Sequence, residues 1–171
     1  IQLLEAAKNR NVNVYVVGYG DAVKFADNIQ LKVLMPDHDW LQFSDDENNN
    51  SLVLRFDYGQ NSFLFMADME AIGERYLINK MKSQLDIDVL KVGHHGSKTS
   101  TTEEFLEATT PNYAVISVGA KNSYGHPHKV TLDQLSQKNI KAFRTDENKD
   151  ITFIMDYKTL KNILYTKKVG E

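Results

Sequence analysis

Short apolar segments alternate with amphipathic ones through the second half of the chain, and this alternation constrains the fold more than any other feature. Apolar segments at 87–93, 112–119 and 140–145 are short enough to be buried strands. Segments with the apolar spacing of helices separate them at 99–111 and 131–139. Because each helix carries the chain back to the same edge of the sheet, successive strands pair in parallel. The second half therefore predicts an α/β fold.

The rest of the chain carries antiparallel signals. Two apolar runs are separated by the turn-forming residues Gly59, Gln60 and Asn61, as in a β-hairpin. The polar stretch 38–51 is expected to be a loop. The other expected elements are helices at 1–11 and 71–84, strands at 12–18, 29–36, 51–58 and 62–66, and a closing hairpin of 150–156 with 160–166. The sheet is therefore expected to be mixed, within a single α/β (α+β) domain.

Composition excludes several kinds of site. The 171 residues suffice for one domain with a buried core, and an apolar fraction of 42% is ordinary for a globular protein. The absence of cysteine excludes disulfides and thiolate metal ligands. With a net charge of −3, contact with nucleic acid would need a local basic patch. Because Ile1 lies inside an expected helix, we expect the chain to be part of a longer gene product.

Ionisable side chains gather where the expected strands end. In open α/β sheets, functional groups collect beyond the carboxyl ends of the strands. The histidines and aspartates at such positions are Asp68, His94, His95, His126, His128 and Asp146. Imidazole and carboxylate groups without thiolate suit Zn²⁺, Mn²⁺ or iron. Taken together, the set is typical of a metal site.

Each of these residues also has a structural interpretation. Asp68 directly precedes an expected helix and, taken alone, is better explained as a helix cap. His94 and His95 could be surface residues, although the glycines on both sides permit unusual dihedral angles and close backbone approach. Either His126 or His128 could cap the next helix. These interpretations stay open beside the functional ones.

Other residues and motifs point away from alternative chemistries. His38 is expected to be solvated in a polar loop. Ser97 lies close to His95, but neighbours in sequence rarely form a nucleophile and base pair. The chain contains no dinucleotide-binding fingerprint, no phosphate-binding P-loop and no GxSxG nucleophile elbow.

Five stretches resemble the C-terminal part of the metallo-β-lactamase superfamily. They are NNNSLVLRFDYG, FLFMADMEAIGE, DVLKVGHHGSKTST, PNYAVISVGAKNSYGHPH and FRTDEN, in this order from residue 48 to residue 148. Within the superfamily, the chain is similar to the hydrolase-like domain of the ComEC-type competence proteins, which take up DNA in bacteria. The resemblance implies an αββα sandwich of mixed sheets covered by helices, with a two-metal site at one edge.

The resemblance also implies roles for individual residues. Asp68 matches the aspartate that bridges two metal ions. His94 and His95 occupy the HHGS signature, one as a metal ligand and the other as a substrate contact or a support for a ligand. His126 matches the YGHP signature, as a late ligand or a phosphate contact. The residues implied to line the substrate site are Ser97, Lys98, Asn122, Tyr124 and His128.

The chain departs from the superfamily pattern at three places. The main metal motif, HxHxDH, is absent, Ala67 stands where the family has glycine before its aspartate, and the family's third histidine would fall near Asn49 or Asn50. We therefore expect residues 1–171 to be a truncated, C-terminal part of a domain of about 250 residues. Its expected structural partner is the missing N-terminal half, and the fragment alone is expected to be weakly active or inactive.

For the parent protein, the resemblance implies a hydrolase that uses two divalent ions, Zn²⁺ or Mn²⁺, and cleaves phosphodiester bonds of DNA with His94, His95 and His126 as catalytic residues. The alternatives are a hydrolase of a small ester, lactone or phosphoester and a metal-free binding or scaffold module. The parent is expected to be bacterial and membrane-associated with this domain on the extracytoplasmic side; a cytoplasmic location is the alternative. Because a partial sandwich exposes apolar surface and strand edges, the fragment is also expected to form homo-oligomers.

Overall fold

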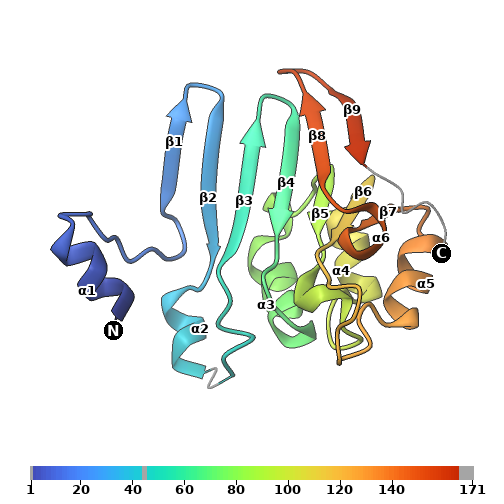
Figure 1. Cartoon of the computed structure of the whole chain (residues 1–171), viewed down its shortest axis with the longest axis horizontal. Helices are drawn as coiled ribbons and strands as arrows, with labels where there is room; N and C mark the ends of the chain where they lie inside the picture. The colour runs from blue at the N-terminus through green and yellow to red at the C-terminus, as the bar shows by residue number, and fades with distance from the viewer. Residues whose placement is uncertain (1, 44–45, 166–171) are drawn as a thin grey trace.

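The computed structural model describes residues 2–43 and 46–165, which build a seven-stranded mixed sheet in the order β1 to β7 (Figure 1). Strands β1 to β4 pair antiparallel, and β4 to β7 pair in parallel. The strands are β1 (Ala22–Ala26), β2 (Ile29–Met35), β3 (Val53–Tyr58), β4 (Asn61–Phe65), β5 (Val89–Lys91), β6 (Tyr113–Ile116) and β7 (Lys141–Arg144). The predicted mixed α/β sheet with parallel pairing in the second half is therefore confirmed.

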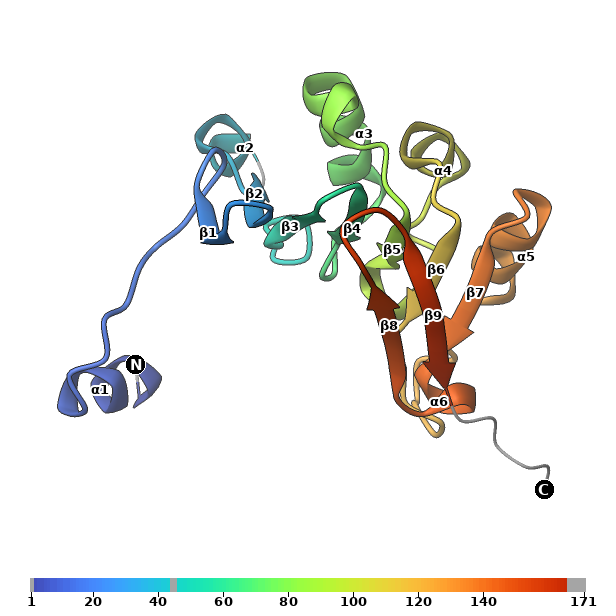
Figure 2. The ribbon, with the colours of Figure 1, turned by 90° about the horizontal axis from the view of Figure 1, so that it is seen from above.

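Helices cover one face of this sheet, and a separate hairpin covers part of the other. Figure 2 shows α2 to α5 on one side and the two-stranded sheet of β8 and β9 on the opposite side. The helices are α1 (Gln2–Asn9), α2 (His38–Phe43), α3 (Ala71–Met81), α4 (Glu103–Thr109), α5 (Lys129–Gln137) and α6 (Thr145–Asn148), with 3₁₀ turns η1 (Lys82–Gln84) and η2 (Gly93–Gly96). The closing hairpin consists of β8 (Ile151–Met155) and β9 (Leu160–Tyr165).

The main core lies between the sheet and α3 to α5. Alternate residues of the central strands, such as Leu64 and Leu90, pack with Leu77, Phe105 and Leu135 of the helices, and all five are at most 1% exposed. Burial of each such side chain contributes about 1.5–3 kcal/mol to folding. This packing holds the carboxyl ends of the parallel strands, and the loops that follow them, in fixed positions.

A smaller aromatic cluster joins the hairpin to the opposite face. The ring of Phe153 in β8 lies 5.6 Å from Phe63, 6.2 Å from Tyr113 and 6.4 Å from Phe143. The hairpin leaves the β1 edge of the sheet open, where Val23 is 50% exposed and Phe25 65% exposed. The expected exposure of apolar surface is therefore observed, while the association of copies stays a prediction.

Two predicted elements differ from the structure in the first half. The predicted strand at 12–18 is absent: this segment is extended and largely exposed, because no other described strand lies beside it to take its backbone hydrogen bonds. Strand β1, which follows it, was not predicted. The segment leads from α1, which has no buried residue, to the sheet (Figure 1).

The predicted loop at 38–51 contains the short helix α2. Asp37 caps this helix, because its Oδ1 accepts the Trp40 backbone N–H at 2.7 Å. The Trp40 indole Nε1–H donates to the backbone oxygen of Asn49 at 2.7 Å and the ring is 6% exposed. A polar composition predicted a loop here, but one buried aromatic residue fastens the segment to the domain.

Candidate active site at the ends of the parallel strands

The parallel strands deliver the predicted site residues to one edge of the sheet. Asp68 follows β4, His94 and His95 follow β5, and His126 lies in the loop after β6. The His95 Nε2 atom lies 3.4 Å from Asp68 Oδ1, and the ring centroids of His94 and His126 are 5.6 Å apart. Residues that are far apart in the sequence therefore meet in a single cluster.

The paired histidines lie in a strained turn. His94 and His95 both adopt left-handed backbone angles, with φ of 44° and 54°. Left-handed angles cost an ordinary residue about 1–2 kcal/mol, so the surroundings must hold this turn in place. The His94 N–H donates to the Ala67 oxygen at 2.9 Å, and the Ser100 hydroxyl donates to the Gly93 oxygen at 2.9 Å. As a result of these backbone angles, the two neighbouring imidazoles point toward different partners.

Both glycines beside the histidines are required by space, and one of them also by its backbone angle. A Cβ on Gly93 would lie 2.8 Å from the Met69 oxygen, and one on Gly96 would lie 2.6 Å from Pro127 Cβ. Gly96 also has a φ of 80°. The interpretation of these glycines as sites of close approach is therefore confirmed for both, and that of an unusual dihedral angle for Gly96.

His95 is oriented toward Asp68 by a backbone carbonyl. Its Nδ1 lies 2.7 Å from the Ser117 oxygen, which can only accept, so Nδ1 carries a proton. In the neutral ring, the lone pair of Nε2 then faces the Asp68 carboxylate across 3.4 Å. Two ligand atoms that are each about 2.1 Å from a tetrahedral ion lie about 3.4 Å apart, so the pair fits two positions of a metal site.

His94 is oriented by a different acid. Its Nδ1 lies 2.9 Å from Glu70 Oε1, which also accepts the Thr99 hydroxyl at 2.9 Å. The backbone N–H groups of Glu70 and Gly73 donate to Asn49 Oδ1, at 3.2 and 3.3 Å. Asn49, near which the family's third histidine would fall, is therefore a buried residue that holds the start of α3 and the acid beside His94.

The start of α3 also decides between two interpretations of Asp68. The N-terminal residue Glu70 is the helix cap, and Asn49 accepts from the first amides. The Asp68 backbone N–H instead donates a hydrogen bond to the Ser51 hydroxyl at 3.0 Å, and the Asp68 carboxylate faces His95. The carboxylate is 45% exposed and free of any capping bond among the described residues, so the capping interpretation is wrong.

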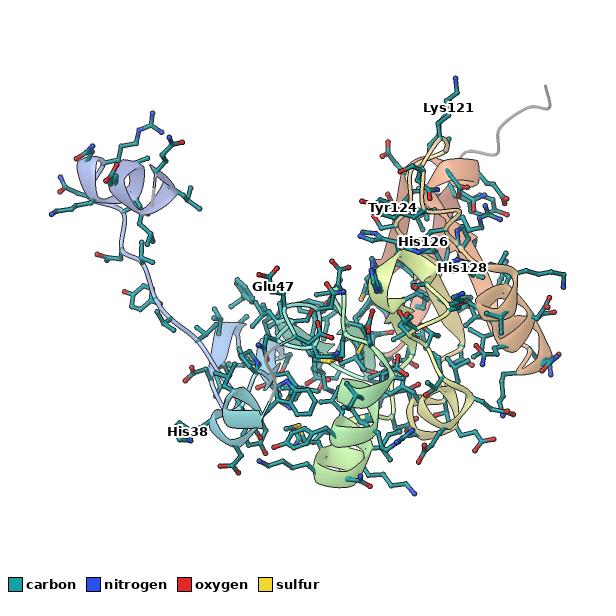
Figure 3. The ribbon with its side chains drawn as sticks, turned by 90° about the horizontal axis from the view of Figure 1, so that it is seen from below. His38, Glu47, Lys121, Tyr124, His126 and His128 are labelled. Carbon is teal, nitrogen blue, oxygen red and sulfur yellow. The ribbon has the colours of Figure 1, made fainter. Side chains whose placement is uncertain are left out.

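His126 forms the other side of the cluster, between Tyr124 and His128. The rings of Tyr124 and His126 lie 5.7 Å apart at 24°, and those of His126 and His128 lie 4.8 Å apart (Figure 3). Burial lowers the pKa of His126, and the neighbouring imidazoles lower it further. His126 is therefore neutral at pH 7. His128 stands at the N-cap position of α5, and its Nδ1 accepts the Lys98 backbone N–H at 3.1 Å.

The other predicted substrate residues have structural contacts. Ser97 is 4% exposed, and its hydroxyl bonds with that of Thr99 at 3.0 Å. The amide of Asn122 donates to the Gly119 and His126 oxygens and accepts the His126 N–H. Ser97 and Asn122 therefore shape their loops, whereas Lys98 and Tyr124 present exposed side chains.

Two other histidine or aspartate residues considered in the sequence lie outside the cluster. His38 begins α2, far from the other histidines, and its side chain is 87% exposed (Figure 3). Asp146 lies in α6 and pairs with Arg144 at 2.6 Å. Neither contributes to the cluster.

A buried acid holds the loop that carries the paired histidines. Glu74 on α3 is fully buried, and its carboxylate accepts the backbone N–H groups of Thr101 and Thr102, the latter at 2.9 Å. Burial raises the pKa of Glu74, although both amides lower it. Sequence reasoning missed Glu70, Glu74 and Asn49, because they act through contacts between distant segments and no local pattern marks them.

Two of the described residues are spaced as neighbouring ligands of one metal ion would be. Asp68 and His95 fit as two ligands, but no group of three or more metal-ligating side chains lies together in the described ranges 2–43 and 46–165. Structural and catalytic zinc centres use three or four protein ligands. A complete centre would therefore need ligands beyond this pair.

The fold agrees with the comparison to known families. The model of the metallo-beta-lactamase superfamily matches residues 22–120, and the chain belongs to this superfamily. Among its relatives, ComE operon protein 3 of Bacillus subtilis (strain 168) is 39% identical over 152 residues, which is 89% of this chain and 19% of that protein.

Two further relatives match shorter parts. Competence protein ComA of Neisseria gonorrhoeae is 41% identical over 59% of this chain and 15% of its own length. Recombination protein 2 of Haemophilus influenzae is 42% identical over 52% of this chain and 11% of its own length. The chain thus spans less than a fifth of each of these bacterial proteins. The resemblance to the superfamily and to competence proteins is confirmed.

Within residues 2–43 and 46–165, none of the helices is both long enough and apolar enough to span a lipid bilayer.

Proposed function

We propose that these residues form part of a metal-dependent phosphodiesterase that cleaves DNA in the course of DNA uptake. The observation that carries the proposal is the cluster in which His95 Nε2 faces the Asp68 carboxylate at 3.4 Å beside the imidazoles of His94 and His126. A carboxylate and three imidazoles on one edge of a sheet suit phosphoryl transfer, where positioning and charge stabilisation do most of the work.

Asp68 and His95 would hold a divalent ion, Zn²⁺ or Mn²⁺, and the remaining ligands of a two-ion centre would come from residues outside this chain. When bound, such an ion supplies a water of lowered pKa and polarises the phosphoryl oxygen. Asp68 contributes the negative charge that the ion requires. The Ser117 carbonyl keeps the His95 proton on Nδ1, and so keeps Nε2 available as a ligand.

His94 and His126 would act on the phosphodiester itself. The Glu70 carboxylate accepts the Nδ1–H of His94, so that when the ring also carries a proton on Nε2, this second N–H can protonate the departing oxygen. His126 is neutral because its pKa is lowered, so it can donate one hydrogen bond to a non-bridging oxygen without adding a full charge.

DNA is the proposed substrate for two reasons. Relatives of the chain include a protein named for competence and another named for recombination. Lys98 and Lys121 are exposed on the two loops that carry the histidines and can meet a phosphate backbone despite the net charge of −3. The proposal places the domain on the extracytoplasmic side of a bacterial membrane, as part of a membrane-associated parent.

The salt dependence of binding tests the choice of substrate. We expect the affinity of the complete protein for an oligonucleotide to fall steeply between about 50 and 200 mM salt, because each phosphate contact releases counterions. Turnover of a small ester or lactone should change little over the same range. Salt-insensitive binding of DNA together with efficient lactone or ester hydrolysis would instead support the alternative of a small-molecule hydrolase.

A further inference from the structure

A small cavity opens directly beside the imidazole cluster. It has a volume of about 200 Å³ and is lined by His95, Val118, Gly119, Asn122, Tyr124 and His126. Pockets for drug-sized ligands usually measure about 300–1,000 Å³, so this one admits a single flat ring system. Gly119 has open space where a side chain would stand, which keeps the cavity accessible.

One of the rings that line this cavity is not buried in the core of the domain. Tyr124 is 77% exposed, which is unusual for so large an aromatic group, and it stacks on His126 at 5.7 Å and 24° (Figure 3). Exposed aromatic rings in proteins that bind single strands stack on bases and contribute about 1–3 kcal/mol per base. The near-parallel pair of rings therefore extends a stacking surface from His126 outward.

The one side-chain amide that lines the cavity is already used within its own loop. The Asn122 amide donates both to the Gly119 oxygen at 2.9 Å and to the His126 oxygen at 2.7 Å, and its own oxygen accepts the His126 N–H at 2.9 Å. Val118 and Gly119 contribute no polar side chain. Apart from the polar atoms of the rings of His95, Tyr124 and His126, no side chain of the cavity is left to bond the edge of a base, so a ring bound here would be held mainly by its faces.

From this arrangement we propose that the cavity receives one unpaired nucleobase, stacked on Tyr124, of the nucleotide next to the bond that is cleaved. The inference rests on the proposed phosphodiesterase function and adds a substrate class: single strands or frayed ends, without base preference. A base inside a duplex cannot enter, because its faces and edge are already covered by its neighbours and its partner.

The test measures binding of the complete protein by fluorescence anisotropy. The probes are a labelled thymidine oligonucleotide of about 12 nucleotides, matched to the site sizes of single-strand binding proteins, and an abasic strand of the same length. Tyr124→Ala should weaken binding of the thymidine strand about 5- to 100-fold and leave the abasic strand unchanged. Tyr124→Phe, which keeps the ring, should bind both strands like the wild type.

The stacking inference would be overturned by equal affinity of Tyr124→Ala and wild type for the thymidine strand, or by an equal loss for both strands. A wild type that prefers a blunt duplex to the single strand would do the same. Cleavage of the thymidine strand, followed in the same samples, reports on the phosphodiesterase function separately. Stacking can therefore fail while cleavage persists, and cleavage can fail while stacking is found.

Discussion

Replacing Asp68 by asparagine in the complete protein should lower the rate of phosphodiester cleavage on the order of 1,000-fold, the scale of loss for a group that acts directly in catalysis. Asparagine keeps the shape of the side chain and removes the charge that would hold a divalent ion opposite His95. The fold should survive, because the carboxylate is 45% exposed and its residue is anchored through its backbone N–H. Steady-state cleavage of a labelled oligonucleotide measures the effect.

Asp133→Asn provides a matched control for this substitution. The Asp133 carboxylate is 46% exposed, close to the 45% of the Asp68 carboxylate. It pairs with Lys129 on α5 and is not part of the cluster. This variant should cleave like the wild type. If Asp68→Asn keeps a rate within about threefold of the wild type, a difference below 1 kcal/mol in the barrier, then Asp68 has no part in catalysis.

Replacing Glu74 by alanine should destabilise the domain by about 2–6 kcal/mol, because two backbone N–H groups lose their acceptor at a cost of about 1–3 kcal/mol each. The substitution leaves the backbone N–H groups of Thr101 and Thr102 unpaired and opens a cavity under the loop of the paired histidines. Urea unfolding measures the loss. Glu104→Ala, at an exposed position of α4, should change stability by less than about 0.5 kcal/mol.

The same carboxyl group makes stability depend on pH. Burial raises the pKa of Glu74 above its ordinary value of 4.5, so the folded state holds this proton more tightly than the unfolded state. The contribution of the protonated form is complete below pH 4.5 and is lost as the pH rises through the folded pKa. Glu74→Gln should lack this dependence. A wild type and a Glu74→Gln variant with parallel stability curves above pH 4.5 would contradict the assignment.

The strands of the parallel sheet were predicted correctly because their apolar side chains are buried in the structure. The segments around Leu90, Ala114 and Phe143 are short and apolar, and each is buried as a strand of the parallel sheet. The segment 12–18 has an equally apolar pattern but is exposed. A strand also needs a neighbouring strand to pair with, and the sequence of the segment alone does not determine whether one is present. Pattern therefore predicts the tendency, and the partner decides the outcome.

The site divides in a similar way. The glycines around His94 and His95 indicated an unusual turn, which the structure contains. The positions of Asp68 and His126 after strands correctly predicted that both lie at the same edge of the sheet. Which imidazole faces Asp68 was not predictable, because it depends on the Ser117 carbonyl, 22 residues away from His95. Glu70 and Asn49, which lie 21 residues apart, likewise meet only in the folded chain.

We propose that the Asp68 and His95 pair holds a divalent ion used in the cleavage of DNA, and metal removal tests this proposal most directly. The measurement is cleavage of a labelled single-stranded oligonucleotide by the complete protein, before and after chelation and again after addition of Mn²⁺ or Zn²⁺. The account predicts that chelation abolishes cleavage and that added metal restores it in the wild type but not in His95→Ala. Cleavage that continues in the chelator, or that metal restores equally in His95→Ala, would contradict it.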